Sequence, residues 1–273
     1  MPAARELDPS ASPSAFFGAE LRHYRVSAGL SQEQLAAKVN YSAALVGSVE
    51  TADRRPQLDL ARRCDDALGT DGALTRLMEM VSRETFPGWF RPWVEVEREA
   101  HTLRSWELAV VPGLLQTEQY ARELLCAEPG ATENRADELV AARLERQALL
   151  SRAEPPLTWF VIAEGVLHCR VGDATVMQEQ LQALLDASRY AHVTIQVVPS
   201  SAGPHPGLNG AFALASFDGA PSVVYLESAR GGQVTDRPAD VTAMGNIYDT
   251  IRAEALPARV SLDLITKVTE QWT

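Results

Sequence analysis

Residues 31 to 50, SQEQLAAKVNYSAALVGSVE, constrain the fold more than any other part of the chain. Ser31 and Gln34 are spaced as a capping box, in which each side chain satisfies the backbone of the other residue and sets the start of a helix. Asn40 follows the first helical segment, and Asn tolerates the left-handed conformation of a tight turn. Ser42 can then cap a second helix. The segment therefore predicts two short helices joined by a turn.

Apolar residues mark one face of each of these two helices. The inward positions are Leu35, Ala36 and Val39 in the first helix and Leu45, Val46 and Val49 in the second. Ala43, Ala44, Gly47 and Ser48 remain mostly outward. Two capped helices at this spacing are typical of a helix-turn-helix, whose second helix enters the major groove of DNA. A small helical bundle that only packs is the alternative.

The flanking sequence predicts three further helices. One ends at Gly29, the next is opened by Pro56 and closed by Gly69, and the last follows directly. Their apolar positions are Phe17, Leu21, Tyr24 and Ala28, then Leu60, Cys64, Ala67 and Leu68, then Leu74, Leu77, Met78 and Val81. From Ser14 to Met80 the chain, with G-L-S-Q-E-Q-L-A, S-x-x-x-V, V-E and R-R-P, resembles the Cro/repressor-type (XRE) helix-turn-helix family. This resemblance implies a five-helix domain that binds double-stranded DNA.

The resemblance also implies which residues contact DNA. Gln32 would meet a phosphate, while Ser42, Ala43 and Ala44 would place the start of the recognition helix over base edges. Alanine can only touch a thymine methyl group or allow close backbone approach, so direct base readout is expected to be sparse. The other predicted DNA-binding residues are Lys38, Ser48, Arg54 and Arg55, with Arg22 and Arg25 as helpers if they share the same face.

The charge balance favours a dimer. Residues 14–80 hold eight Lys or Arg against nine Asp or Glu, and the whole chain has a formal net charge of −11. Gly47 and Ser48 depart from the Ser followed by Arg or Lys that family members often carry, which removes a phosphate contact. A single module with few phosphate contacts binds DNA poorly at physiological salt. The sequence therefore predicts that two copies read two half-sites.

Length and composition indicate two domains. The 273 residues, 46% of them hydrophobic, can bury a large core. We predict a disordered tail over 1–13, a helix-turn-helix domain over 14–82 and a regulatory and dimerisation domain over 83–273. No run approaches about 18 apolar residues, so we expect a cytoplasmic protein without a membrane span. Neither a disulfide nor a zinc site is suggested by the spacing of Cys64, Cys126 and Cys169.

Beyond residue 82 the sequence predicts an α+β domain with a small, largely antiparallel sheet flanked by helices. Helices are expected over 91–104, 114–127, 133–151, 176–189, 238–255 and 258–271. Strands are expected over 157–163 and 193–198, with a hairpin formed by 212–217 and 222–227. Together with the helical amino-terminal domain, these elements predict a multidomain fold.

Four aromatic residues, Phe86, Trp89, Phe90 and Trp93, cluster at the start of this second domain. We interpret them as local core at the junction of the two domains. A platform on which a ligand stacks is the alternative, in which Trp89 and Trp93 would bind the ligand or partner.

The second domain also resembles a known family. The motifs that carry the resemblance, over residues 86–271, are V-P-G-L-L-Q-T-E-Q-Y-A, R-L-E-R-Q, A-E-G-V-L-H-C-R-V-G, M-x-x-Q-L, I-Q-V-V-P, G-P-H-P-G and V-V-Y-L-E. They are similar to those of WhiJ-like actinobacterial regulators, in which this domain follows a helix-turn-helix. The resemblance implies an antitoxin-like arrangement, in which a small partner protein encoded nearby relieves repression.

An enzymatic reading would rest on Glu164, Arg170, His205 and Glu227, polar residues beside predicted strands or in the Gly-Pro loop. No nucleophile elbow, phosphate-binding loop or pair of metal ligands accompanies them. We therefore predict a protein that is not an enzyme and that uses no cofactor or metal. The same four residues remain candidates for binding a ligand or a partner.

Two ways of controlling the regulator stay open. Loop 199–210 can border a small-molecule pocket beside strand edges. A strand edge or the helix over 133–151 can instead contact a partner protein. We predict a sequence-specific dimeric regulator, acting as a repressor under the control of a small partner protein. The alternatives are a small-molecule-responsive regulator and, third, an interaction module or an enzyme that uses Glu164, His205 and Glu227.

Overall fold

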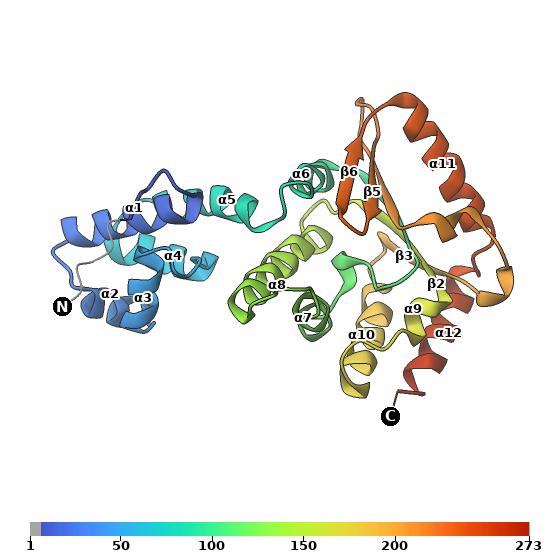
Figure 1. Ribbon diagram of the computed structural model, residues 1–273, viewed down its shortest axis with the longest axis horizontal. Helices are drawn as coiled ribbons and strands as arrows, with labels where there is room; N and C mark the ends of the chain where they lie inside the picture. The colour runs from blue at the N-terminus through green and yellow to red at the C-terminus, as the bar shows by residue number, and fades with distance from the viewer. Residues whose placement is uncertain (1–6, 273) are drawn as a thin grey trace. The chain divides into compact units, whose positions relative to one another are not determined.

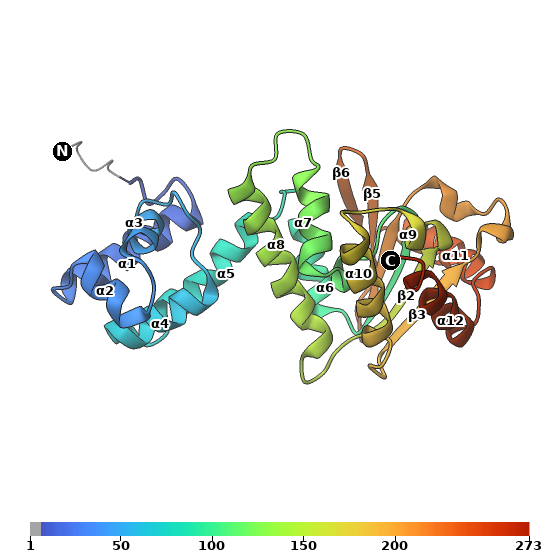
Figure 2. The same ribbon diagram turned by 90° about the horizontal axis from the view of Figure 1, so that it is seen from below.

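The computed structural model describes residues 7–272, with the side chains of residues 79 and 82–85 outside the description. The chain separates into two compact units, residues 1–87 and 88–273 (Figures 1 and 2). Residues 1–6 of the predicted tail lie outside the described residues. Ser12, within the predicted tail, caps the first helix by accepting a hydrogen bond from the Ala15 N–H at 3.0 Å. The first helix therefore begins at Pro13, within the predicted tail.

The first unit contains five helices, as predicted. They are α1 (Pro13–Ser27), α2 (Gln32–Val39), α3 (Ala43–Glu50), α4 (Leu58–Leu68) and α5 (Ala73–Thr85). Their shared core contains Phe17, Leu21, Leu35, Val46 and Leu60, all fully buried. The prediction that Pro56 opens α4 was wrong, because that helix begins two residues later with Gln57 as its N-cap. Gly69 ends it in the left-handed conformation, as the sequence indicated.

The second unit is an α+β fold. Its helices are α6 (Arg91–Glu99), α7 (Glu118–Cys126), α8 (Glu133–Gln147), α9 (Glu164–His168), α10 (Ala174–Ala187), α11 (Pro238–Ala253) and α12 (Ala258–Thr269). Its strands are β1 (Thr102–Glu107), β2 (Leu157–Ala163), β3 (Val193–Val198), β4 (Phe212–Ser216), β5 (Val223–Ser228) and β6 (Gly231–Thr235). Short 3₁₀ turns occupy Gly113–Leu115, Ala148–Ser151, Ser200–Ala202 and Pro206–Asn209.

The six strands form one mixed sheet in the order β3-β2-β1-β4-β5-β6. The β1–β2 and β2–β3 pairs are parallel, whereas β1–β4, β4–β5 and β5–β6 are antiparallel. The sheet therefore changes from parallel to antiparallel at β1, in its middle. It is larger than the small sheet that we predicted.

Strand β1 was wrongly predicted as the end of a helix over 91–104. Leu103 and Trp106 are three residues apart, which suggests one face of a helix. In the strand, an odd spacing puts them on opposite faces, and each joins a different core. Because both faces of β1 are covered, the alternation that marks a half-exposed strand is missing.

Strand β6 was not predicted, because its sequence G-G-Q-V-T carries too few apolar residues to indicate a strand. The packing explains one of these glycines. A Cβ atom at Gly232 would lie 2.1 Å from the Tyr225 ring, so only glycine lets that ring cross the edge of the sheet.

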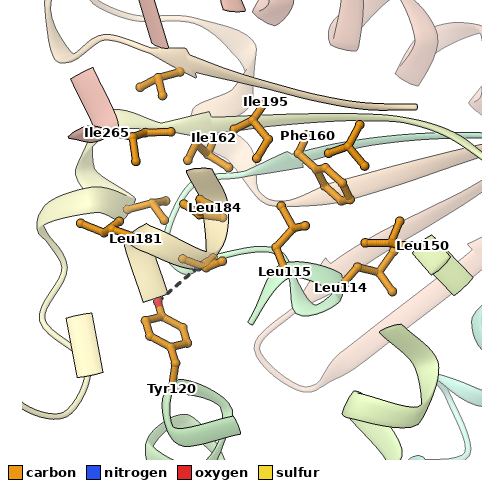
Figure 3. Packing of buried hydrophobic residues seen from close by; sticks show 14 of the residues in the cluster. Leu114, Leu115, Tyr120, Leu150, Phe160, Ile162, Leu181, Leu184, Ile195 and Ile265 are labelled. Carbon is orange, nitrogen blue, oxygen red and sulfur yellow. Dashed lines mark hydrogen bonds between the residues drawn. The ribbon is translucent and has the colours of Figure 1, made fainter. Parts of the chain in front are cut away.

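Helices cover both faces of the sheet (Figures 1 and 2). The larger core lies between the sheet and α7, α10 and α12, and Figure 3 shows part of its packing. The Tyr120 hydroxyl accepts a hydrogen bond from the Val111 N–H in this core at 3.2 Å. The opposite face packs against α11 around Trp106 and Tyr248. In the described part of the chain, no helix is both long and apolar enough to cross a membrane.

Candidate DNA-binding surface

The turn between α2 and α3 has the predicted capping geometry. The Ser31 side chain accepts a hydrogen bond from the Gln34 N–H at 3.1 Å, and the Ser31 N–H donates to the Gln34 side-chain oxygen at 2.8 Å. Asn40 is left-handed, with φ 58° and ψ 47°. The Ser42 hydroxyl caps α3 by accepting from the Leu45 N–H at 3.2 Å. The prediction of two capped helices joined by a left-handed Asn is confirmed.

The outward face of α3 is made of small side chains. Ser42 and Ala44 are exposed, whereas Ala43, Gly47 and Ser48 are half-buried. The Ser48 hydroxyl donates to a backbone carbonyl of its own helix at 2.9 Å. The exposed part of this helix therefore presents few hydrogen-bonding groups to a base edge, which is consistent with sparse direct readout.

A buried carboxylate ties the first three helices together. Glu50, the last residue of α3, is fully buried. The Arg25 guanidinium of α1 donates to both of its oxygens, through Nη2 at 2.8 Å and through Nε. The Gln32 amide of α2 donates to Glu50 Oε2 at 2.8 Å, and Arg22 Nε lies 3.7 Å from the same oxygen. We call Arg25, Gln32 and Glu50 the Glu50 network.

The Glu50 network gives two predicted DNA-contacting side chains a role inside the domain. Arg25 also donates through Nη1 to the Leu30 carbonyl at 2.8 Å, so its guanidinium is committed within the unit. Help from Arg25 in holding a phosphate, predicted only if it shares the DNA-contacting face, stays a prediction. Its hydrogen bond to Glu50 raises the pKa of Arg25. The Gln32 amide likewise donates to Glu50. A phosphate contact by this side chain stays a prediction.

The sequence did not reveal this network. Glu50 lies next to an apolar position of α3, and nothing in the spacing separates it from an exposed helix-end Glu. Gly47 was a usable signal, since it replaces a common Ser. A Cβ atom at Gly47 would lie 3.3 Å from Gln32 Oε1. Gly47 therefore leaves room for Gln32 to lie across α3 and reach Glu50.

The remaining predicted cations lie at the ends of α2 and α3. Lys38 and Arg54 are exposed, and Arg55 is half-buried. Arg54 follows a tight turn in which its N–H donates to the Ser48 carbonyl at 3.0 Å. Within that turn Ala52 has φ 57°, a left-handed value that is unusual for a residue with a Cβ atom.

The predicted aromatic cluster packs onto the β5–β6 hairpin within the second unit. Trp93 is buried and stacks on Tyr225, with ring centroids 5.4 Å apart. Phe90 meets the same ring edge-on at 5.5 Å. Trp89 is 42% exposed, and its ring covers Gly231. These contacts favour the interpretation of Phe90 and Trp93 as local core, while Trp89 keeps an exposed surface.

The structure does not join the polar residues of the enzymatic interpretation into one site. Glu164 accepts from the Ser200 N–H at 2.6 Å, and Arg170 donates to the Gly172 carbonyl at 3.1 Å. His205 accepts from the Gly207 N–H at 3.2 Å and packs edge-on against Trp106. No hydrogen bond or ion pair connects Glu164, His205 and Glu227 in the described part of the chain.

Glu227 instead belongs to a group that sequence reasoning missed. Electrostatic coupling links it to Glu107 at the end of β1 and to two arginines of α8, Arg143 and Arg146. Arg143 donates to the side chain of buried Gln116. The only signal was the spacing of the arginines in R-L-E-R-Q, three residues apart on one helical face. No group of three or more His, Cys, Asp or Glu within the described residues is placed to hold a metal ion.

The fold and the capped α2–turn–α3 segment define a helix-turn-helix DNA-binding protein. Residues 17–78 match the family described as "Helix-turn-helix domain", and residues 90–267 match "Domain of unknown function (DUF5753)". Because the second match covers well over half of the chain, the protein belongs to the DUF5753 family. No curated protein and no solved structure matches the chain significantly.

Proposed function

We propose that this protein is a sequence-specific transcriptional repressor that binds its operator as a dimer in the cytoplasm. The observation that carries the proposal is the capped α2–turn–α3 unit, which leaves Ser42 and Ala44 exposed at the start of α3. Lys38 and Arg54 are the exposed cations that we assign to phosphates. In this role the Glu50 network orients α3, since it ties that helix to α1 and α2.

Dimer formation follows from the small number of phosphate contacts that one copy can make. The net charge of −11 repels DNA at long range, and the outward face of α3 offers little direct readout. Two copies on two half-sites double both the phosphate contacts and the base contacts. We assign dimer formation to the second unit.

We infer further that the protein is a WhiJ-like actinobacterial regulator of the XRE type, controlled by a small partner protein in an antitoxin-like manner. The motif resemblance over residues 86–271 supports this inference. In this proposal the second unit binds and does not catalyse, because Glu164 and His205 already accept hydrogen bonds from nearby backbone N–H groups. A small-molecule signal is the second candidate, and the charged group around Arg143 favours it.

The test is fluorescence-anisotropy binding of the full chain to the DNA upstream of its own gene, with scrambled DNA of equal length as the control. We expect selective binding that weakens with salt, with a log–log slope of about −0.9 for each phosphate contacted. The stoichiometry at saturation is expected to be two chains per operator. Equal affinity for both DNAs at every salt concentration would contradict the proposal. Adding the product of the adjacent gene is expected to release the operator.

A further inference from the structure

Two carboxylates lie in one row across the sheet, on the face that carries the larger core. Glu107 ends β1 and Glu227 lies near the end of β5, and extending the register of β1, β4 and β5 by one residue puts Ala211 between them. The Glu227 N–H donates to the Ala211 carbonyl at 3.1 Å. Because side chains alternate along a strand, Glu107 and Glu227 share the face that carries Leu103 and Tyr225. The strands that bear the two carboxylates are two strand spacings apart, about 10 Å.

The opposite charges come from α8. Arg143 and Arg146 are three residues apart and therefore share one side of the helix. Arg146 forms an ion pair with buried Glu97 at 3.1 Å and lies 5.0 Å from the Phe90 ring centroid. Arg143 has a neutral partner, the side chain of Gln116. The cations thus belong to the helix and the anions to the sheet.

These opposite charges interact without touching. In the described part of the chain, neither Glu107 nor Glu227 forms an ion pair or a side-chain hydrogen bond with Arg143 or Arg146. Burial nevertheless raises the pKa of Glu107 well above its ordinary value, and repulsion from Glu227 adds to that effect. Burial lowers the pKa of Arg143 to about 10. Both groups therefore lack a close counter-charge.

A buried hydroxyl on the same face also lacks a partner. Ser105 lies two residues before Glu107 on β1, and its Oγ atom is buried without a hydrogen-bond partner in the described structure. Across the sheet, Ser105 pairs with Ala213, which pairs with Tyr225. Buried hydroxyls without partners are uncommon in native proteins, and a bound polar molecule is one of the few explanations. The methyl side chain of Ala213 takes up little room between Ser105 and Tyr225.

We propose that the cluster of Ser105, Glu107, Arg143, Tyr225 and Glu227 binds a small zwitterion of the α-amino-acid class. The carboxylate of the ligand meets Arg143, and its ammonium group meets Glu107 and Glu227. A purely anionic ligand would face two carboxylates, and a purely cationic ligand would leave Arg143 without a counter-charge. A molecule that carries both charges complements both sides.

The site lies where a ligand can enter and affect the fold. Glu227 is exposed, so the cluster reaches the surface at the end of β5. It also lies at the carboxyl end of β1, where the sheet changes from parallel to antiparallel, and such ends commonly bind ligands in α/β sheets. A bound zwitterion would bridge α8 to β1 and β5. Its use as a regulatory signal rests on the proposed function, whereas the binding itself does not.

The test uses the full chain and a panel of the standard L-amino acids, each at up to about 10 mM. Binding is measured as a rise in the thermal midpoint and then by calorimetry. We expect at least one amino acid to bind with a Kd of about 1 mM or tighter. Its methyl ester, which lacks the carboxylate, and its N-acetyl derivative, which lacks the ammonium group, are expected to bind about 10- to 100-fold more weakly. Absence of binding across the panel overturns the proposal.

Two variants assign the ends of the ligand. Arg143→Gln is expected to weaken binding of the amino acid and to remove the preference over its methyl ester. Glu227→Gln is expected to remove the preference over the N-acetyl derivative. The matched controls are Arg135→Gln and Glu138→Gln, an ion pair on the same helix outside the cluster, which should leave both preferences unchanged. Unchanged preferences in the two site variants, with far-ultraviolet circular dichroism intact, overturn the proposal.

The same samples separate this proposal from the proposed function. Amino-acid binding without operator binding leaves the ligand site in place and contradicts the repressor. Operator binding without any change of the thermal midpoint on addition of amino acids supports the repressor and overturns the ligand site. If acetate binds as tightly as the best amino acid, the cluster is an anion site, and the proposal of a zwitterionic ligand is overturned.

Discussion

Two clusters of charged residues in this protein, one in each unit, are built in opposite ways. In the first unit Glu50 is fully buried, and Arg25 and Gln32 contact it directly. In the second unit Glu107 and Arg143 lack direct contact, although burial shifts the pKa of each group toward its uncharged form. The Glu50 carboxylate makes its hydrogen bonds within the fold, so its role is to hold the helices together. Glu107 and Arg143 are not paired with each other, so each can still form an ion pair with a ligand.

Removing the Glu50 carboxylate is expected to have the largest effect. Glu50→Gln leaves the Arg25 guanidinium buried without its counter-charge, which should lower the free energy of unfolding of the first unit by about 3–5 kcal/mol. Urea unfolding followed by circular dichroism measures the change. Asp66→Asn, which removes an exposed carboxylate from α4, is the control and should cost about 0.5 kcal/mol or less. Equal costs for the two variants would show that the Glu50 network does not hold the helices together.

Glu107→Gln is expected to raise the free energy of unfolding at neutral pH, whereas Glu50→Gln lowers it. The folded-state pKa of Glu107 is raised, so its stabilising contribution is complete below the ordinary value of 4.5 and is lost as the pH rises toward the folded-state value. Glu107→Gln has no carboxyl at this position and therefore does not lose stability in this way. Its advantage in unfolding free energy over the native chain should grow above pH 4.5 by up to about 1.4 kcal/mol per pH unit.

Urea titrations of both chains between pH 4.5 and 8 measure this difference. Glu227, Arg143 and Arg146 interact electrostatically with Glu107 and are present in both chains, so the comparison isolates the Glu107 carboxyl to first order. An advantage that does not change with pH would mean that Glu107 already has a counter-charge, as Glu50 has.

Substitution of Arg54, an exposed arginine of the first unit, should affect DNA binding and leave stability unchanged. Arg54→Ala is expected to weaken operator binding about tenfold and to lower the magnitude of the salt slope by about 0.9 per chain. The thermal midpoint should not move, because the side chain is exposed. Arg62→Ala, an exposed arginine of α4, is the control for general charge. A variant Arg54→Ala that binds as tightly as the native chain would remove this residue from the DNA surface.

The smallest expected effect concerns backbone conformation. Ala52→Gly relieves the left-handed strain after α3 and should raise the unfolding free energy by about 0.5 kcal/mol, since part of the gain is lost to the freer unfolded chain. Ala37→Gly, at an exposed position inside α2, is the control and should lower it by about 0.5–1 kcal/mol. Thermal or urea unfolding distinguishes the two signs.

The contrast between the units also explains how far sequence reasoning reached. In the first unit the helices are short and amphipathic, and their ends carry Ser, Asn and Gly residues with recognisable capping roles. The prediction therefore holds for all five helices. In the second unit β2, β3, β4 and β5 carry enough apolar or β-branched residues to be recognised, and they were predicted within a residue or two. The edge strand β6 was missed because it has few apolar residues. The buried central strand β1 was missed because its apolar spacing is that of a helix.

The candidate sites also differ in how far apart along the chain their contacting residues lie. Local residues such as Ser31, Asn40 and Ser42 act on their own backbone within a few positions, and short-range spacing reveals them. Glu50 and Arg25 are 25 residues apart, and Trp106 meets Gly207 across 101 residues. No local pattern encodes a pairing at that distance.

The sequence alone was therefore enough to establish two units, the helix-turn-helix with its capped ends, and the α+β class of the second unit. These features depend on hydrogen bonds and apolar faces that repeat over four residues or fewer. Only the tertiary structure could place Glu107 and Glu227 in one row and set Arg143 opposite them. That arrangement depends on strand register and on which helix covers which face, and both are decided by packing between segments that lie far apart along the chain.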